Sequence, residues 1–142
     1  MALLRKVELL PAGARTVTGN GNEFDFSPDA GFAEFQLDVT AAATEAGDTL
    51  DVFVQTSVDG VNWIDIVHFT QVLGNGGAKR HVAKILRDVA EAMFEAGTAL
   101  AAGAVRNIFG TKFRVRWTIA DVATLGNQSF NFSVNANAGL YG

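Results

Sequence analysis

The chain has 142 residues, no cysteine and a formal net charge of −4, and 49% of its residues are hydrophobic. This length indicates one domain that buries roughly two-thirds of its unfolded surface, so neither a disulfide nor a metal is required for stability. The absence of cysteine excludes disulfides, thiolate catalysis and thiolate metal sites.

Neither of the two apolar segments of the chain predicts contact with a membrane. The first residues, MALLRKVELLPAGA, do not read as a signal peptide, because Arg5, Lys6 and Glu8 interrupt the apolar pairs. The alanine-rich stretch near residue 100 is too short and too weakly hydrophobic to cross a bilayer. We therefore expect no membrane partner.

Charge is distributed unevenly along the chain. Residues 1–78 contain 3 basic and 11 acidic residues, a net charge of −8, whereas residues 79–142 contain 8 basic and 4 acidic residues, a net charge of +4. Such halves pair within the fold or between subunits, and we favour pairing within the fold because the strands of a small sandwich interleave. The few basic residues of an acidic chain argue against nucleic acid as a partner.

Residues 1–31 are predicted to form an N-terminal arm and turn-rich segment. Residues 1–10 read as a short strand or extended arm closed by Pro11, and residues 12–31 are rich in glycine, asparagine and other turn formers. The segment has little apolar periodicity, yet its apolar side chains need a surface to cover them. We predict that six of them contact a neighbouring subunit or a shell protein: Leu3, Leu4, Val7, Leu9, Leu10 and Phe24.

The next segments alternate between apolar and polar residues. Residues 32–43 alternate regularly, which predicts a half-buried antiparallel strand. Residues 50–69, LDVFVQTSVDGVNWIDIVHF, contain two strand-like runs joined at Asp59-Gly60, which is a β-hairpin signature because glycine tolerates positive φ and aspartate bonds its own turn. The second run is apolar on both faces, so we expect an interior strand or one that a partner covers.

The pattern changes after the glycine-rich loop at residues 74–77. From residue 79 to residue 96, apolar residues recur at spacings of three and four, which predicts an amphipathic helix and a helical insertion over about residues 79–104. Two alternating runs, FRVRWTIAD and SFNFSVNANA, then predict the last strands. Eight residues are predicted to share one core: Phe35, Leu37, Val52, Val54, Val115, Trp117, Phe130 and Phe132.

These elements predict a mainly β fold. Residues 32–142 are expected to form a single antiparallel β-sandwich or jelly-roll-like domain that carries the helical insertion. A closed barrel is the alternative architecture.

The sequence offers little catalytic chemistry. No nucleophile elbow, HExxH, Walker A or GxGxxG pattern occurs. His68 and His81 lie 13 residues apart, with no third metal ligand at a local spacing. Five acidic residues lack the dense oxygen ligands of a calcium loop and are interpreted as solvated carboxylates: Glu45, Asp48, Asp51, Asp59 and Asp65. We therefore predict no catalytic residue, no cofactor and no metal site.

The aromatic residues permit two interpretations. Trp63, Trp117 and the eleven phenylalanines would suit a platform for stacking sugars, but most of them share a face with aliphatic residues, as core residues do. The segment SVDGVNW is similar to a shortened Asp-box, the turn of sialidase-like propellers. It occurs once and without a repeat, which argues against a propeller.

Three segments together carry a resemblance to a known family: LDVFVQTSVDGVNWIDIVHFTQVLGNGG, AGAVRNIFGTKFRVRWTIAD and FNFSVNANAG. Over roughly residues 32–138 the chain resembles the small β-rich virion proteins of tailed bacteriophages. The resemblance implies a capsid decoration or head-stabilising protein, oligomeric and without catalysis, that is made in the host cytoplasm and lies on the capsid surface. Its implied partners are the major capsid protein or other virion proteins, and itself.

A closed homo-oligomer, with a trimer preferred, is the expected assembly. The alternative function is a carbohydrate- or receptor-binding β-sandwich module of a phage tail, which needs exposed aromatic rings on a concave sheet face. A hydrolase ranks third, because it needs two carboxylates or a histidine–carboxylate pair to converge in one cleft.

Overall fold

A computed structural model of the chain describes residues 5–25, 28–122 and 126–140. In these ranges the chain forms β-strands and no helix. The strands are β1 (Arg5–Arg15), β2 (Gly19–Asn20), β3 (Phe24–Asp25), β4 (Phe32–Ala41), β5 (Thr49–Ser57), β6 (Ile64–His68), β7 (Val72–Leu73), β8 (Lys79–Leu86), β9 (Lys112–Ala120) and β10 (Phe130–Gly139).

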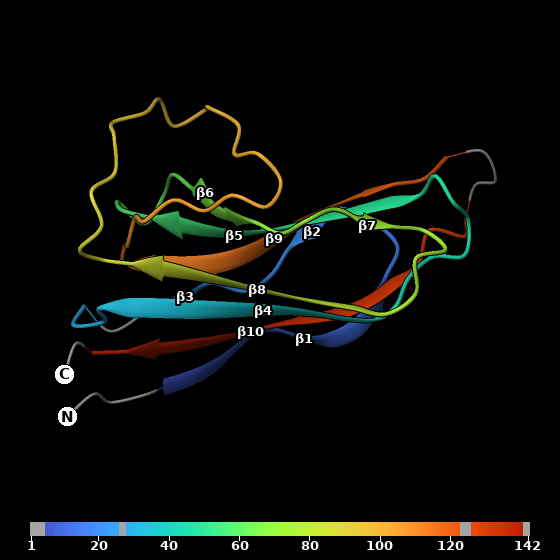
Figure 1. Ribbon diagram of the computed structural model, residues 1–142, viewed down its shortest axis with the longest axis horizontal. Coiled ribbons are helices and arrows are strands. Elements are labelled where there is room, and N and C mark those ends of the chain that lie inside the picture. The colour runs from blue at the N-terminus through green and yellow to red at the C-terminus, as the bar shows by residue number, and fades with distance from the viewer. Residues whose placement is uncertain (1–4, 26–27, 123–125, 141–142) are drawn as a thin grey trace.

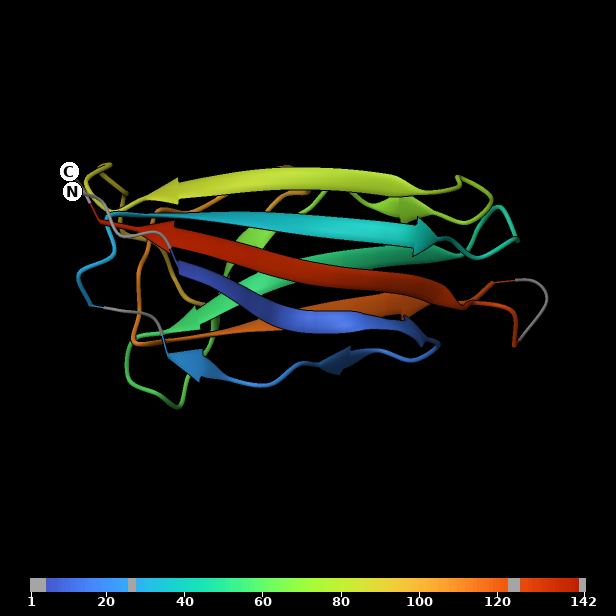
Figure 2. The same cartoon turned by 90° about the horizontal axis from the view of Figure 1, so that it is seen from below.

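The strands form two antiparallel sheets that lie face to face (Figure 1). Sheet A has the order β1-β10-β4-β8, and Figure 2 shows these four strands side by side. Sheet B has the order β2-β9-β5-β6, with β3 also paired to β9 and β7 to β5. The predicted antiparallel β-sandwich is therefore confirmed.

The strand pairing is that of one long hairpin wrapped around a core. The first strand pairs with the last, β1 with β10, and the pairs β2/β3–β9, β4–β8 and β5–β6 follow inward along the chain. If β2 and β3 count as one interrupted strand and the two-residue β7 is set aside, every connection except the β5–β6 hairpin crosses between sheets. This topology is a jelly roll, as the predicted β-sandwich or jelly-roll-like fold allowed.

The core lies between the sheets and is apolar. Alternate residues of β4 and β10 face it from sheet A, and those of β5 and β9 face it from sheet B. The Trp117 and Phe132 rings meet edge to face at 5.9 Å, so aromatic contacts join the two sheets. All eight predicted core residues are buried, with at most 8% of any of them exposed: Phe35, Leu37, Val52, Val54, Val115, Trp117, Phe130 and Phe132.

The predicted hairpin turn is confirmed at the β5–β6 connection. Gly60 has a φ of 81°, which an L side chain rarely adopts. The Asp59 Oδ1 atom accepts hydrogen bonds from the backbone N–H groups of Asn62 and Val61, at 2.7 and 2.8 Å. These bonds stabilise the carboxylate, so they hold the pKa of Asp59 well below its usual range.

The predicted helical insertion over residues 79–104 is wrong. Residues 79–86 instead form β8, which pairs along its whole length with β4 and completes sheet A. In this strand His81, Ala83 and Ile85 face inward, while Val82 is 65% exposed, so the residues also fit a strand period. Without this strand, the backbone groups along one edge of β4 would have no sheet partner, and this tertiary pairing overrides the local helical period.

The rest of the predicted insertion is an irregular loop, residues 87–111, which lies over the outer side of sheet B (Figure 1). Tertiary hydrogen bonds fix it: the Leu86 N–H donates to Asn107 Oδ1 at 2.9 Å, and Arg87 Nε donates to the Ala30 carbonyl. None of the described ranges contains a helix long and apolar enough to span a membrane.

Residues 5–25 belong to the two sheets. β1 pairs with β10 from Arg5↔Ala138 to Arg15↔Phe130, and β2 and β3 pair with β9. The described part of the predicted N-terminal arm therefore supplies strands to the sandwich, because its backbone finds partners in β9 and β10.

Candidate functional site

Among the residues that the structure describes, no group of polar side chains suited to a substrate lies between the sheets. The buried hydrophobic cluster fills it, and the largest fully buried side chains are phenylalanine, leucine, isoleucine and valine. Any functional site on the described residues must therefore lie on an outer face, at a sheet edge or among the loops.

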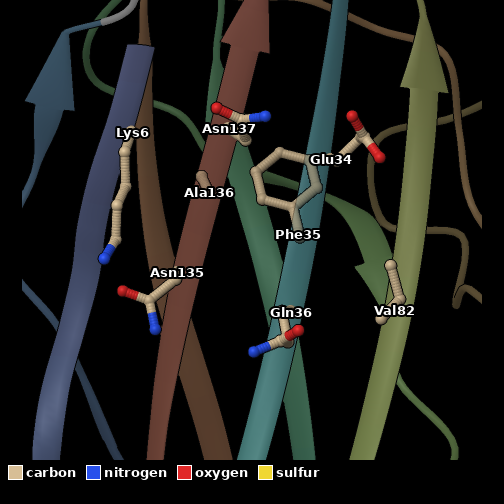
Figure 3. A pocket seen from close by; sticks show the side chains of 8 residues that line it. All are labelled: Lys6, Glu34, Phe35, Gln36, Val82, Asn135, Ala136 and Asn137. Atoms are coloured by element: carbon tan, nitrogen blue, oxygen red, sulfur yellow. The ribbon is translucent and has the colours of Figure 1, made fainter. Parts of the chain in front are cut away.

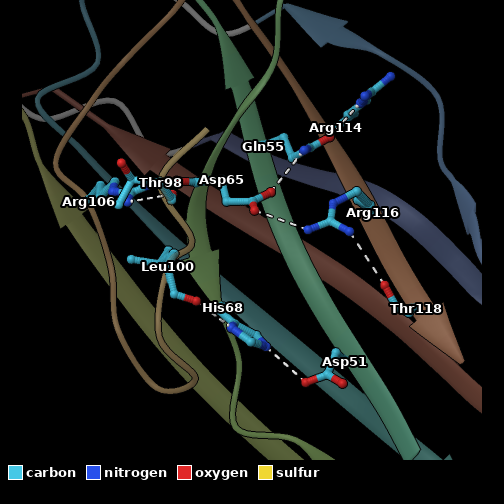
Figure 4. A network of polar contacts seen from close by, with 10 residues as sticks. All are labelled: Asp51, Gln55, Asp65, His68, Thr98, Leu100, Arg106, Arg114, Arg116 and Thr118. Atoms are coloured by element: carbon cyan, nitrogen blue, oxygen red, sulfur yellow. Dashed lines mark hydrogen bonds and ion pairs between the residues drawn. The ribbon is translucent and has the colours of Figure 1, made fainter. Parts of the chain in front are cut away.

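A polar network covers the outer face of sheet B (Figure 4). The Asp65 carboxylate lies at its centre, where it accepts hydrogen bonds from Gln55 Nε2 at 2.9 Å and from Arg116 at 3.0 Å. Gln55 Oε1 accepts in turn from Arg114 Nε at 2.8 Å. Partial burial lowers the pKa of Arg114 below its usual value. Each member of the network has a partner, so the network is suited to fixing the strands rather than to binding a substrate.

His68, considered above as a candidate for metal binding and catalysis, is held on both sides of its ring. Its Nε2 atom lies 2.9 Å from Asp51 Oδ1, and its Nδ1 atom lies 2.8 Å from the Leu100 carbonyl oxygen. Each ring nitrogen is therefore occupied by a contact within the chain. The arrangement ties the loop at residue 100 to β5 and β6.

His68 and His81 line the same hollow, of about 120 Å³, between β8 and the loop at residues 103–105. The remaining lining residues are apolar, apart from Thr70 and backbone groups. Two histidines, one of them fully hydrogen-bonded, do not make a three-ligand metal site.

Arg106 fixes the loop over sheet B. It is 8% exposed, and its guanidinium donates to the carbonyl oxygens of Thr98 at 2.9 Å and Asp65 at 3.2 Å (Figure 4). The same guanidinium lies 4.1 Å from the centre of the Phe94 ring. No sequence motif marks this residue, because its partners come from the loop before it and from β6.

The loop also covers the open edge of β6. The Arg106 N–H donates to the Ile66 carbonyl at 2.8 Å, the His68 N–H to the Ala104 carbonyl at 3.1 Å, and the Gly103 N–H to the His68 carbonyl at 2.7 Å. The expectation that a partner covers this apolar strand is met by another segment of the same chain.

The aromatic side chains of the described residues do not form a sugar-stacking platform. In the described ranges every phenylalanine and tryptophan is buried or half-buried. The Trp63 ring is covered by the Arg114 guanidinium at 4.3 Å, and the Phe53 ring by Arg116 at 3.9 Å. Among the described residues, no exposed aromatic ring is present to support the carbohydrate-binding alternative.

The outer face of sheet A is the opposite case, since none of the described segments covers it (Figures 1 and 2). It carries a hollow of about 280 Å³ to which all four strands contribute (Figure 3). The side chains along it are mostly amides and charged groups: Lys6, Glu34, Gln36, Asn135 and Asn137, with Val82 at the β8 side. It is a polar surface without a nucleophile or a buried acid.

The two oppositely charged halves of the sequence meet within the fold. Three ion pairs each join an acidic residue from residues 1–78 to a basic residue from residues 79–142: Asp38–Arg80 at 3.6 Å, Glu23–Lys112 at 3.5 Å and Asp65–Arg116 at 3.0 Å. The intramolecular interpretation of the charge pattern therefore accounts for these pairs.

The predicted contact residues lie in different surroundings. Leu9 and Leu10 are buried in the chain's own core at 0% and 4% exposure, and Val7 and Phe24 are partly buried against it. Leu3 and Leu4 lie outside the described residues. The chain's own core therefore covers these four side chains, and no neighbour is needed to do so. Contact between this segment and a neighbouring subunit stays a prediction.

Comparison with solved structures identifies a similar fold in a virus. A chain of the structure of infectious bursal disease virus, Gx strain, superposes with a TM-score of 0.55 and 10% sequence identity, over 99% of this chain and 32% of that chain. This chain therefore spans about a third of the length of the viral chain, and at this identity the likeness concerns the fold. No protein-family model and no curated protein matches the sequence.

Proposed function

We propose that this chain is a structural virion protein without catalytic activity, and that it decorates or stabilises a phage head shell as a closed homo-oligomer, with a trimer as the preferred state. The observation that carries the proposal is the jelly-roll topology, matched over 99% of the chain by a chain of a virus structure. Jelly rolls are used by viral capsid proteins, lectins and cupins. The residues that each of these functions requires distinguish between them.

The sites favour the structural use. A cupin-like enzyme needs metal ligands between the sheets, where this chain places apolar residues. A lectin-like module is favoured by exposed aromatic rings, which the described residues lack. For the histidine–carboxylate pair that a hydrolase would use, both ring nitrogens of His68 already have contacts within the chain, to Asp51 and to the Leu100 carbonyl oxygen.

We further propose that the outer face of sheet A contacts the shell. This face is left uncovered, spans all four strands and presents amides that are able to donate and accept hydrogen bonds across an interface. Asn135 and Gln36 lie opposite each other near its centre.

Two measurements test the proposal. Light scattering on the purified chain across concentrations is expected to give the mass of a closed oligomer. Sedimentation with phage head particles purified from cells that express the chain is expected to show it in fixed stoichiometry with the shell protein. The proposal is contradicted if light scattering gives the mass of a monomer and the chain does not sediment with the particles.

A substitution locates the contact. Asn135→Arg places a bulky charge at the centre of the proposed face, so particle binding should fall at least about tenfold while the melting temperature stays within about 2 °C. Val61→Arg is the matched control, because Val61 is 75% exposed at the β5–β6 turn, on the other sheet. Equal binding by both variants would exclude sheet A as the contact.

A further inference from the structure

Two loops at one end of the sandwich bring three carboxylates together. Asp48 directly precedes β5, and Asp121 directly follows β9. Because Thr49 pairs with Ala120 in the antiparallel β5–β9 ladder, the two aspartates lie side by side just beyond the last pair. Glu45 joins them from the β4–β5 loop, and oxygen atoms of the three side chains all lie within 4.8 Å of one another.

The two aspartates use their oxygen atoms in the same way. Asp48 Oδ1 accepts from the Val122 N–H at 2.9 Å, and Asp121 Oδ2 accepts from the Gly126 N–H at 3.0 Å. The other oxygen of each, Asp48 Oδ2 and Asp121 Oδ1, is buried and has no hydrogen-bond partner within the described structure. Each carboxylate is thus oriented by one oxygen and leaves the second available to a ligand.

Structural hydrogen bonds alone do not account for the burial of Asp48 in this cluster. Its side chain is fully buried at 0% exposure, in a cluster of like charges. A buried carboxylate oxygen without a donor costs free energy unless a cation or a proton compensates it. None of the ion pairs found among the described residues includes Asp48 or Asp121.

We propose that Glu45, Asp48 and Asp121 bind a calcium ion that joins the β4–β5 loop to the β9–β10 loop. Calcium binds oxygen at 2.3–2.6 Å, so two ligands on opposite sides of one ion lie at most about 5 Å apart, as these oxygens do. Magnesium requires stricter octahedral geometry and retains its waters, and zinc prefers histidine or cysteine, which this cluster lacks. The inference does not depend on the proposed function.

Calorimetric titration and thermal unfolding test the site with Ca²⁺ itself. We expect saturable binding of one ion and a rise in melting temperature of roughly 3–8 °C at about 5 mM Ca²⁺ relative to EDTA. Mg²⁺ at the same concentration should give less than about half of this shift. Absence of saturable Ca²⁺ binding overturns the proposal.

Three variants separate a metal site from a structural cluster. Asp48→Asn and Asp121→Asn should each weaken Ca²⁺ binding at least about tenfold. In EDTA, Asp48→Asn should melt no lower than the wild type, because it removes a buried like charge. Glu45→Gln supplies the same test for binding if an aspartate variant does not fold.

Asp25→Asn is the matched control, since Asp25 is exposed on β3 beside Lys112, at the other end of β9. It makes the same chemical change and should retain the full Ca²⁺ shift. Retention of that shift by Asp48→Asn, Asp121→Asn and Glu45→Gln would overturn the proposal. So would a wild type that gains stability on acidification but not from Ca²⁺, because the two aspartates would then share a proton.

Discussion

Asp59 shows how one side chain determines a turn. It is fully exposed, yet it accepts hydrogen bonds from two backbone N–H groups and from the Asn62 side chain at 2.7 Å. The ionised form makes these bonds best, which is why its pKa lies below the usual value. Protonation of Asp59 weakens these hydrogen bonds and therefore destabilises the β5–β6 turn.

The free energy of unfolding should therefore depend on pH through Asp59. Its pKa is lower in the folded than in the unfolded chain, so the unfolded chain binds the proton first. The stabilisation is complete above the ordinary aspartate pKa of about 4 and decreases as the pH falls below it. Urea unfolding of wild type and Asp59→Asn at pH values of about 7 and 2.5 should show a stability difference that shrinks in acid. A difference that is constant with pH contradicts this assignment.

Trp117 joins the two sheets through its ring and its N–H group. The ring is 8% exposed and packs against Phe132, and Nε1 donates to the Val17 carbonyl at 2.7 Å. Trp117→Ala should lower the free energy of unfolding by about 3–5 kcal/mol, because it leaves a cavity. Trp63→Ala, at a half-buried ring that contacts Arg114, should cost about 1 kcal/mol. Chemical denaturation measures both, and a loss below about 1 kcal/mol for Trp117→Ala would show that Trp117 is not core.

At the scale of elements, the loop at residues 87–111 takes the place of a covering strand or helix. It supplies backbone partners to the edge of β6, and Arg106 holds it through two carbonyl groups. The loop belongs to neither sheet and contains no regular strand or helix, so it should open separately from the sheets.

Arg106→Ala should release this loop locally. The amides of residues 103–106 and of His68 should exchange with deuterium roughly tenfold faster or more, because the charged donor of two hydrogen bonds is lost. Amides in the centre of β5 and β9 should keep their protection. Arg80→Ala, at an exposed arginine of β8, is the control and should leave the loop unchanged. Uniformly faster exchange throughout the protein would mean that Arg106 stabilises the whole fold.

For the whole molecule, protected sheet edges limit how the chain can associate. The outer edge of β1 contains Pro11 and two register shifts, and β8 carries Lys79, Arg80 and Lys84. Proline, bulges and charged residues discourage pairing between sheet edges. With β6 covered by the loop, association through side chains on a sheet face is favoured over addition of a strand.

β1 should be essential to the sandwich rather than a detachable arm. Leu9→Ala should cost about 2–5 kcal/mol, because Leu9 is completely buried. Deletion of residues 1–15 should abolish cooperative unfolding, which circular dichroism during heating will report, since it removes the whole partner strand of β10. Val17→Ala, at a 69% exposed residue, is the control substitution. An unchanged melting curve for the truncated chain would restore the arm interpretation.

The amino-acid sequence was sufficient to predict the features that depend on residues close together along the chain. Alternation in residues 32–43 and in FRVRWTIAD identified strands and their buried faces, and Asp59-Gly60 identified a turn, because side-chain period and turn chemistry are local properties. The apolar face of each strand then required a two-layer fold, which made a sandwich the natural prediction.

The pairing of the strands, and the residues that the loops bring together, became known only from the three-dimensional fold. Residues 79–86 fit both a helix and a strand, and the unpaired edge of β4 selected the strand. The β5–β9 register placed Asp48 beside Asp121, although 72 residues separate them in the sequence. Arg106 and His68 found partners in segments remote from their own. The partners in these contacts come from segments that are distant in the sequence and are brought together by the strand topology. Local periodicity of the sequence does not predict which distant segments meet.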